Sequence, residues 1–484
     1  MKDLKLIVRR AYRKAAVKVA LLYPSTYQAA MSSAVYHMLY FKLQDEGFYV
    51  ERFTADHGAR GVEDGTPLGH FDYVVATVHY ELDYVNLVKM LISAGIPPRA
   101  ADRKRPKLVV GGPPVAANPE PLAEFADAVA VGELEPLWDA LVQYLATGEE
   151  AVGLYYPAKG PHPVEVKYAK RVEPDYRRMP EPEAAFSLAV ELARGCPYSC
   201  LFCMESYITK PYRPRDWRVA LDEAEKLYSK YGVRPSIVAL TANAHPGFKE
   251  LLAEAARRRL RLSLPSMRAE LLDEETVELL AAVGQRTLTI APETSERLRR
   301  ALGKEMSNED VLRVAKKAGE LGMRLKLYLM VGLPCERPED LEEVASLMKE
   351  VRRVAGAVSL SLNPFIPKPQ TPLQYSPMAP LAYLKEKIEH LRRAHQGEFS
   401  FYDPALGAVQ AAISLGGREI SRHIEAAAAS QSPLGYWKRA LRSGELHYVF
   451  KPREEPLPWS HIRGFYKPEE LRRRYRQFLE QACG

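Results

Sequence analysis

Three of the five cysteines in this chain lie close together, as Cys196, Cys200 and Cys203, with the spacing Cys-x3-Cys-x2-Cys. Thiolates are soft ligands that suit iron–sulfur clusters, and cysteines this close on one loop can all reach the same cluster. Three ligands leave one iron of a four-iron cluster without a protein ligand. Because a catalytic cluster needs such an open iron, the spacing indicates catalysis rather than simple electron transfer.

Two other interpretations of these cysteines are a zinc site and three unrelated core thiols. Structural zinc takes four ligands, and no Cys or His follows Cys203 closely. His245 is the next candidate for a fourth ligand. The ligand count therefore favours an iron–sulfur cluster over zinc.

The cysteine stretch resembles the signature of the radical S-adenosylmethionine (radical SAM) superfamily. That signature has the same spacing, with an aromatic residue directly before the last cysteine, here Phe202. The resemblance implies that Cys196, Cys200 and Cys203 hold a [4Fe–4S] cluster and are the catalytic ligands, with SAM chelated by the open iron and Phe202 beside the cofactors. The reduced cluster would cleave SAM to a 5′-deoxyadenosyl radical, which abstracts a hydrogen atom from the substrate.

The segments around the cysteines alternate between strands and helices from residue 186 to about 395. Apolar runs predict strands at 188–193, 236–240, 261–264, 286–290, 324–331 and 357–362, with amphipathic helices between them. Six such units predict a partial (β/α)6 barrel of the TIM type, in which chemistry sits at the carboxyl ends of the strands. The cysteine loop follows the first strand, so the two signals agree on the position of the site.

The turns after the second and third strands carry polar residues that the resemblance places near SAM. Many superfamily members have a Gly-Gly-Glu turn after the second strand, which holds the methionyl amino group. This chain has Thr241 and Asn243 there instead, and a polar helix entry is the alternative explanation. After the third strand, Arg268 is expected next to the methionyl carboxylate, which a guanidinium can bind with two hydrogen bonds.

Three further positions resemble SAM-binding segments. Glu293 and Ser295 match a pattern in which a glutamate and a serine approach SAM, with helix capping by Thr294 or Ser295 as the alternative. The fifth strand ends at Gly332, where a glycine lets the adenine ring lie against the backbone. Cys335 is interpreted as a small-residue substitution without a cysteine partner. Near the end of the chain, Cys483 is interpreted as an inert or frayed thiol.

Residues 1–150 predict a doubly wound parallel sheet, with strands at 17–24, 49–54, 73–79, 107–113 and 128–132. Its glycine turns resemble the cobalamin-binding-type domain that precedes many radical SAM barrels. The usual Asp-x-His-x-x-Gly motif is missing, because the loop after the first strand has no histidine, although His79 ends the third strand. Cobalamin binding and a vestigial or substrate-binding sheet both remain open. The glycines are equally well explained by tight turns.

The chain has 484 residues, which predicts two to four domains. We expect a cobalamin-binding-type domain at 1–150, a proline-rich connector at 151–185, the barrel at 186–395 and a helical, basic region at 396–484. The composition is that of a soluble globular protein, with 47% hydrophobic and 27% charged residues. No apolar run is long enough for a membrane span and no secretory leader is evident, so a cytoplasmic location without membrane contact is expected.

The leading interpretation is a radical SAM enzyme that acts on an unidentified substrate. The resemblance implies a reducing partner of the flavodoxin or ferredoxin type. The alternatives are a cobalamin-dependent radical SAM methyltransferase and a non-catalytic iron–sulfur protein that binds RNA. The net charge of +7 permits RNA, and Arg472, Arg473, Arg474 and Arg476 lie on one predicted helix, although a solvated helix face is the commoner explanation.

Overall fold

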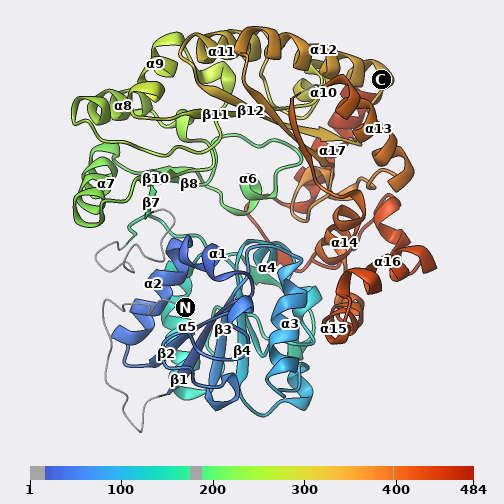
Figure 1. Ribbon diagram of the computed structural model, residues 1–484. Helices are drawn as coiled ribbons and strands as arrows, with labels where there is room; N and C mark the ends of the chain where they lie inside the picture. Colours follow the sequence, from blue (N-terminus) through green and yellow to red (C-terminus); the bar gives the residue numbers. More distant parts are fainter. Residues whose placement is uncertain (1–16, 175–187, 396) are drawn as a thin grey trace. The chain divides into compact units, whose positions relative to one another are not determined.

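Two series of parallel strands organise the chain in the computed structural model, which describes residues 17–174, 188–395 and 397–484 (Figure 1). The first unit consists of Met1–Leu188, Ala412–Leu446 and Glu455–Phe465. The second unit consists of Ala189–Ala411, His447–Glu454 and Tyr466–Gly484. The residues after 396 are therefore shared between the two units.

The first unit is built on a parallel sheet with the strand order β2-β1-β3-β4-β5. This arrangement confirms the predicted doubly wound sheet. The order reverses beside β1, and ligands of such sheets bind outside the carboxyl ends of the strands at this point. The strands are β1 Lys18–Tyr23, β2 Tyr49–Thr54, β3 Tyr73–Thr77, β4 Lys107–Gly111 and β5 Ala128–Ala130.

One face of this sheet is covered by α2 (Ala34–Asp45) and α5 (Leu134–Thr147), whose apolar side chains join one buried core with the strands. The helix α3 (Asp83–Ser93) packs against α15 (Ser421–Ala429) from much later in the chain. This part of the unit also contains α1 Tyr27–Met31, α4 Pro113–Ala117, α16 Pro433–Ser443 and the parallel pair β6 Val164–Glu165 and β15 Ile462–Arg463.

Two polar contacts attach the segment Ala412–Leu446 to the rest of the first unit. The side-chain amide of Asn118, which is buried, donates to the carbonyl oxygens of Ser414 and Gly416, each at 2.9 Å. The guanidinium of Arg99 forms an ion pair with Glu425 at 2.8 Å. Sequence reasoning cannot find these contacts, because the paired residues are about three hundred positions apart.

The second unit repeats strand and helix. The strand β7 lies beside β10, and β11, β12, β13 and β14 follow one another as parallel neighbours. Single parallel bridges at Ser236–Ser263 and Met267–Ile290 link the two groups. The strands are β7 Leu188–Glu191, β10 Pro235–Val238, β11 Thr287–Glu293, β12 Arg324–Val331, β13 Val358–Pro364 and β14 Glu398–Phe401.

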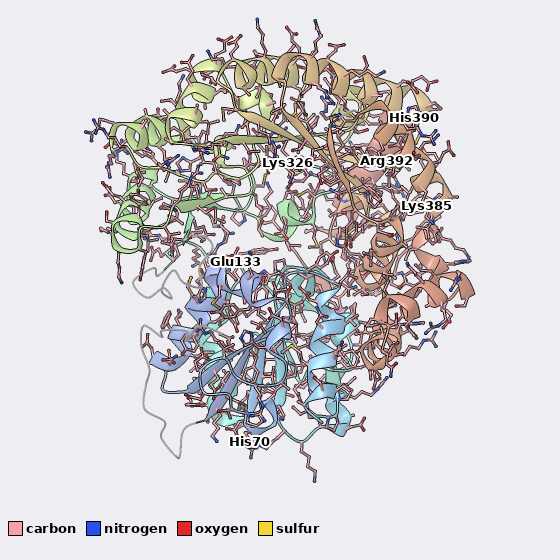
Figure 2. The ribbon with its side chains drawn as sticks, viewed as in Figure 1. His70, Glu133, Lys326, Lys385, His390 and Arg392 are labelled. Carbon is pink, nitrogen blue, oxygen red and sulfur yellow. A yellow bond between two sulfur atoms is a disulfide. The ribbon has the colours of Figure 1, made fainter. Side chains whose placement is uncertain are left out.

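Amphipathic helices connect these strands. On α13 the buried residues Leu384, Ile388 and Leu391 alternate with the exposed residues Lys385 and His390, which Figure 2 shows together with Arg392. The other helices are α7 Trp217–Tyr231, α8 Phe248–Arg257, α9 Glu274–Ala282, α11 Asn308–Glu320, α12 Pro338–Ala355 and α14 Pro404–Leu415, with the short α6 Met204–Ile208 and α10 Glu296–Ala301. The α/β fold class is as predicted.

Two strands of the second unit differ from prediction. The expected strand at 261–264 makes only the single bridge of Ser263, since Pro265 follows and has no N–H for a ladder. The strand β14 lies in a region that was expected to be helical. Three of its four residues are exposed, so it carries no apolar pattern that would reveal it. In the residues that the structure describes, no helix is both long and apolar enough to cross a membrane.

The interpretation of Cys335 and Cys483 as unpaired thiols is wrong. The structure joins them in a disulfide, with Cα atoms 5.1 Å apart and a sequence separation of 148. The helix α17 (Pro468–Cys483) makes this pairing, because its Phe478 and Ala482 pack into one core with Leu298 and Leu333. A disulfide that depends on such packing leaves no signal in the local sequence.

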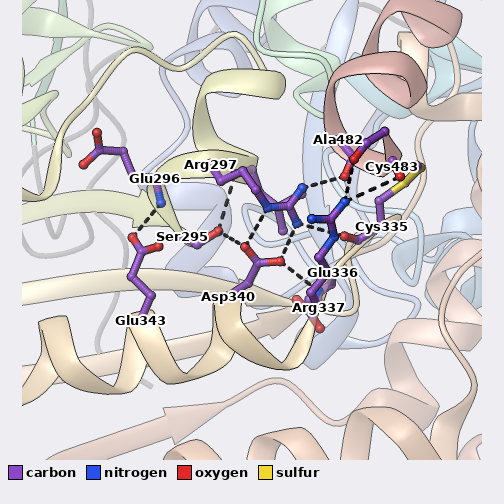
Figure 3. Close-up of polar contacts among 12 residues, drawn as sticks. Ser295, Glu296, Arg297, Cys335, Glu336, Arg337, Asp340, Glu343, Ala482 and Cys483 are labelled. Carbon is purple, nitrogen blue, oxygen red and sulfur yellow. Dashed lines mark hydrogen bonds and ion pairs between the residues drawn. A yellow bond between two sulfur atoms is a disulfide. The ribbon is translucent and has the colours of Figure 1, made fainter.

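Polar contacts surround the disulfide on both sides (Figure 3). The Arg297 guanidinium donates to the carbonyl oxygens of Ala482 at 2.5 Å and Cys335 at 3.0 Å, and forms an ion pair with Asp340 at 2.5 Å. Arg337 donates to the carbonyl oxygen of Gly484 at 2.9 Å. Arg297 thus connects both ends of the disulfide to α12, so α17 is fixed by charge as well as by the covalent bond.

We predict that the variant Cys483→Ser lowers the free energy of unfolding by about 2–5 kcal/mol under non-reducing conditions, because the disulfide closes a long loop in the unfolded chain. Urea titration with and without dithiothreitol measures this difference. Dithiothreitol should bring the wild-type protein to the level of the variant and leave the variant unchanged. A wild-type protein that is insensitive to dithiothreitol would contradict the prediction.

Candidate functional site

The three cysteines lie on the loop that follows β7 and the short strand β8 (Ala193–Arg194). Cys196 and Cys200 are buried, Cys203 is half-buried, and none of the three is in a disulfide. After Cys203 the chain forms α6 and returns as β9 (Arg213–Pro214), which pairs antiparallel with β8. The loop is therefore anchored at both ends, and three free thiols lie between the anchors.

Gly195 permits the close contact that closes this loop. Its φ is +78°, and a Cβ atom there would lie 2.5 Å from the carbonyl oxygen of Thr209 and 2.8 Å from that of Pro211. No side chain fits in that space. The returning segment carries Lys210, whose ammonium donates to the carbonyl oxygen of Cys196 at 2.5 Å.

Polar groups from three other loops contact the cysteines. The Thr241 hydroxyl lies 3.4 Å from Cys196 Sγ, and the Gly303 carbonyl oxygen lies 4.0 Å from Cys200 Sγ. A guanidinium nitrogen of Arg268 donates to Cys200 Sγ at 3.7 Å. The Arg268 guanidinium also lies over the ring of Tyr198, 3.8 Å from its centroid.

Burial makes free thiolates unfavourable in this loop. It raises the pKa of Cys203 to about 12, and it raises the pKa of Cys200 although the positive charges of Lys304 and Arg268 act in the opposite direction. Thiolates that are shielded from water require bound metal or nearby cations for their stability. The donor set therefore fits a metal cluster better than it fits reactive free thiols.

The structure argues against zinc at this loop. Both ring nitrogens of His245 have protein partners, since Nε2 lies 2.8 Å from the Arg215 carbonyl oxygen and Nδ1 accepts from the Gly247 N–H at 3.0 Å. Within the described ranges, no three His, Cys, Asp or Glu side chains are grouped closely enough for a single metal ion. In a four-iron cluster each thiolate binds a different iron, so the three sulfurs do not have to meet at one point.

Asn243 and Arg268, both predicted to lie near SAM, are joined by hydrogen bonds. Asn243 is buried, and its side-chain amide donates to the Arg268 carbonyl oxygen at 2.8 Å and accepts from the Arg268 N–H at 3.2 Å. Arg268 forms an ion pair with Glu270 in addition to its contacts with Tyr198 and Cys200. Asn243 therefore orients the backbone of Arg268, while the Arg268 guanidinium faces the cysteine loop.

Glu293 and Ser295, which were predicted to approach SAM, interact with Lys304 and Asp340. Glu293 ends the strand with a φ of +66°, an uncommon backbone conformation for this residue type, and forms an ion pair with Lys304 at 2.8 Å. Ser295 caps α10, since its hydroxyl accepts from the Leu298 N–H at 3.4 Å and donates to Asp340 at 2.5 Å. The capping alternative for Ser295 is confirmed.

Gly332 and Phe202 are also explained by packing. A Cβ atom at Gly332, whose φ is +81°, would lie 2.5 Å from Leu384 Cδ2 of α13. Its N–H donates to both carboxylate oxygens of Glu336 at 3.0 Å. Phe202 is half-buried and packs with Phe478 of α17 in one apolar core. These contacts explain both residues by packing within the second unit.

Arg474 of the basic C-terminal helix α17 makes contacts within the second unit. The Arg474 guanidinium lies 4.7 Å from the ring centroid of Tyr466, and the Tyr466 hydroxyl lies 2.9 Å from Ser199 Oγ in the cysteine loop. The rings of Tyr466 and Tyr207 also lie 5.0 Å apart. Arg474 therefore supports the wall of the cysteine loop.

Sequence reasoning missed Lys210, Lys304, Tyr198 and Glu270, which lie in or near this loop. Tyr198 lies within the cysteine motif, and Lys210 follows that motif closely in sequence. Only these two positions gave any local signal. The approach of Lys304 to Cys200 depends on how separate loops meet.

At the carboxyl edge of the sheet in the first unit, His79 is exposed and stacks on Tyr23, with centroids 5.3 Å apart. Its Nε2 lies 2.7 Å from the Thr77 hydroxyl. A Cβ atom at Gly112 would lie 1.9 Å from the Val78 carbonyl oxygen, and one at Gly132 would lie 2.2 Å from that of Lys167. Tight backbone packing thus explains both glycines.

Comparisons with known proteins agree with this geometry. The radical SAM superfamily profile matches residues 190–348, and the profile for the N-terminal region of radical SAM proteins matches residues 39–153. An uncharacterised protein of Methanocaldococcus jannaschii is 30% identical over 392 residues, which cover 78% of this chain and 84% of that protein. The bacteriochlorophyllide d C-8(2)-methyltransferase of Chlorobaculum tepidum is 32% identical over 169 residues, 32% of this chain and 36% of that enzyme.

Solved structures show a similar fold. The radical SAM methyltransferase TsrM of Kitasatospora setae, solved with cobalamin and a [4Fe–4S] cluster bound, matches with a TM-score of 0.57 and 17% identity over 88% of this chain and 100% of that one. The cobalamin-dependent SAM radical enzyme OxsB matches with a TM-score of 0.50 and 14% identity over 97% of this chain and 80% of that one. From the superfamily profile together with the archaeal relative, this chain belongs to the radical SAM superfamily.

Proposed function

We propose that the loop of Cys196, Cys200 and Cys203 holds the [4Fe–4S] cluster on which this radical SAM enzyme cleaves SAM. The observation that carries the proposal is three free thiols at a strand end, surrounded by buried cations. A cluster bound by three thiolates is an anion, and Arg268, Lys304 and Lys210 supply compensating charge. When bound and reduced, the cluster supplies the electron that breaks the sulfonium bond of SAM.

The residues around the loop have separate tasks in this proposal. Thr241, beside Cys196, and Glu293 offer polar oxygens to the amino acid and ribose parts of SAM. Arg268 supplies positive charge near the SAM carboxylate, with its backbone held by Asn243. Phe202, which packs in an apolar core, and Gly332 are proposed to lie beside the adenine part of SAM. Burial of the loop keeps water from the reacting atoms.

Cobalamin-dependent methyl transfer is a second candidate for the reaction. It is supported by the fold match to all of the TsrM chain and by the methyltransferase among the relatives. In this candidate the five-stranded sheet would bind cobalamin at the edge where His79 is exposed. The enzyme takes electrons from a reducing partner, for which we propose a flavodoxin or ferredoxin in the cytoplasm. The substrate is unidentified, and RNA is one class to include in the search.

We predict that the anaerobically reconstituted wild-type protein holds about four irons, the content of one [4Fe–4S] cluster. The variant with alanine at Cys196, Cys200 and Cys203 should hold none, because no thiolate remains at the loop. Iron analysis and the visible absorption spectrum measure this content. The matched control carries alanine at Cys335 and Cys483 and should keep the iron; retention of iron by the first variant would refute the assignment.

We predict that Glu293→Gln weakens SAM binding to the reconstituted protein by about tenfold or more, the loss expected for a hydrogen bond to a charged group. The matched control Ser295→Ala removes a helix cap, so it should lower the free energy of unfolding by about 0.5–2 kcal/mol and leave SAM affinity unchanged. Calorimetric titration with SAM and urea unfolding separate the two effects. Equal affinity for SAM in wild type and Glu293→Gln would remove Glu293 from the site.

The two candidate reactions differ in measurable ways. Production of 5′-deoxyadenosine from SAM after reduction with dithionite is expected for hydrogen abstraction. Methyl transfer predicts a change in the visible spectrum when cobalamin is titrated into the protein, and His79→Ala should alter that change. Absence of any spectral change on titration would exclude the cobalamin candidate and leave the SAM-cleavage assignment intact.

A further inference from the structure

Within the part of the chain that the structure describes, Lys210 is a buried cation without a carboxylate partner. Only 7% of its surface is exposed, and its ammonium donates to the carbonyl oxygen of Cys196 at 2.5 Å. The other two cations near the thiols have acidic partners, since Arg268 pairs with Glu270 and Lys304 pairs with Glu293. Among the described residues, no Asp or Glu lies within ion-pair distance of Lys210.

Backbone contacts of the surrounding fold hold Lys210 in position. Pairing of β8 with β9 draws the segment of residues 209–212 onto Gly195, where the backbones touch. Arg213 holds the same segment, because its guanidinium donates to the carbonyl oxygens of Thr209 and Pro211, each at 2.9 Å. The ammonium is therefore held at the first cysteine of the loop.

A buried ammonium without a counter-charge is unfavourable, because the hydration that it loses is not replaced. The carbonyl oxygen of Cys196 supplies a dipole but no charge. The loop beside Lys210 carries three thiols that become anionic when they bind iron. A cluster core with three thiolates has a net negative charge, and one-electron reduction adds a further negative charge without a proton.

We propose that Lys210 is the electrostatic partner of the cluster and that its ammonium sets the reduction potential of the cluster. This inference rests on the assignment of the cluster to Cys196, Cys200 and Cys203. A fixed positive charge stabilises the more negative, reduced state more than the oxidised state. Lys210 therefore makes the cluster easier to reduce. It is a positioning and tuning residue that does not itself contact the reacting atoms.

Redox titration of the reconstituted protein, followed by electron paramagnetic resonance, tests the proposal. Lys210→Met should lower the midpoint potential by at least about 59 mV, which corresponds to a tenfold change in a one-electron equilibrium. Lys210→Arg keeps the charge and should retain the wild-type potential to within that amount. Lys226→Met removes an exposed lysine of α7 and should leave the potential unchanged. An unchanged potential in Lys210→Met would overturn the proposal.

Thermal unfolding of the iron-free proteins gives an independent test if Lys210→Met binds no cluster. Without iron, the ammonium is an uncompensated buried charge, so the iron-free variant should unfold at a higher temperature than the iron-free wild type. A lower or equal unfolding temperature, together with loss of the cluster, would show a structural role for Lys210 and overturn the proposal. If wild type holds iron and Lys210→Met behaves as wild type, the cluster assignment stands and only this inference fails.

Discussion

The central constraint in this structure is electrostatic, because the three sulfurs that we propose as cluster ligands lie in a loop shielded from water. Desolvation raises the pKa values of Cys200 and Cys203, which opposes the charged form that binds iron. At Cys200 the positive charges of Arg268 and Lys304 act against this rise, and a third cation, Lys210, contacts the carbonyl oxygen of Cys196. Arg268 and Lys304 have their own carboxylate partners, Glu270 and Glu293, whereas Lys210 is proposed to be balanced by the cluster.

Much of the second unit serves to position these charges. Asn243 is used entirely for the backbone of Arg268, and Glu293 adopts an uncommon backbone conformation where it meets Lys304. The helix α17 closes another side, since its apolar residues pack with Leu201 and Phe202 of the cysteine loop. Its disulfide and the contacts of Arg297 fix the end of that helix. The positions of the side chains around the cysteines therefore depend on elements from the whole length of the unit.

The sequence predicted those features that depend on residues close together in the chain. The cysteine spacing marks the loop directly, and β12 matches its predicted bounds because its buried residues Leu325, Leu327, Leu329 and Val331 alternate with less buried ones. The role of Ser295 as a cap was one of two open interpretations, and the hydrogen bond from the Leu298 N–H to its hydroxyl decided between them. Lys210, the disulfide and β14 could not be predicted, because each depends on which distant segments meet or on a strand with little buried surface.

The division of the late chain between the two units has a practical consequence for anyone dissecting this enzyme. The segments 412–446 and 455–465 complete the first unit, while 447–454 and 466–484 return to the second. A fragment that stops after β14 would leave the side chain of Asn118 without the carbonyl oxygens of Ser414 and Gly416, and α3 without α15. It would also lose Tyr466 and α17 from the cysteine loop. Terminal truncation therefore damages both halves at once, and separating them requires internal excision and rejoining.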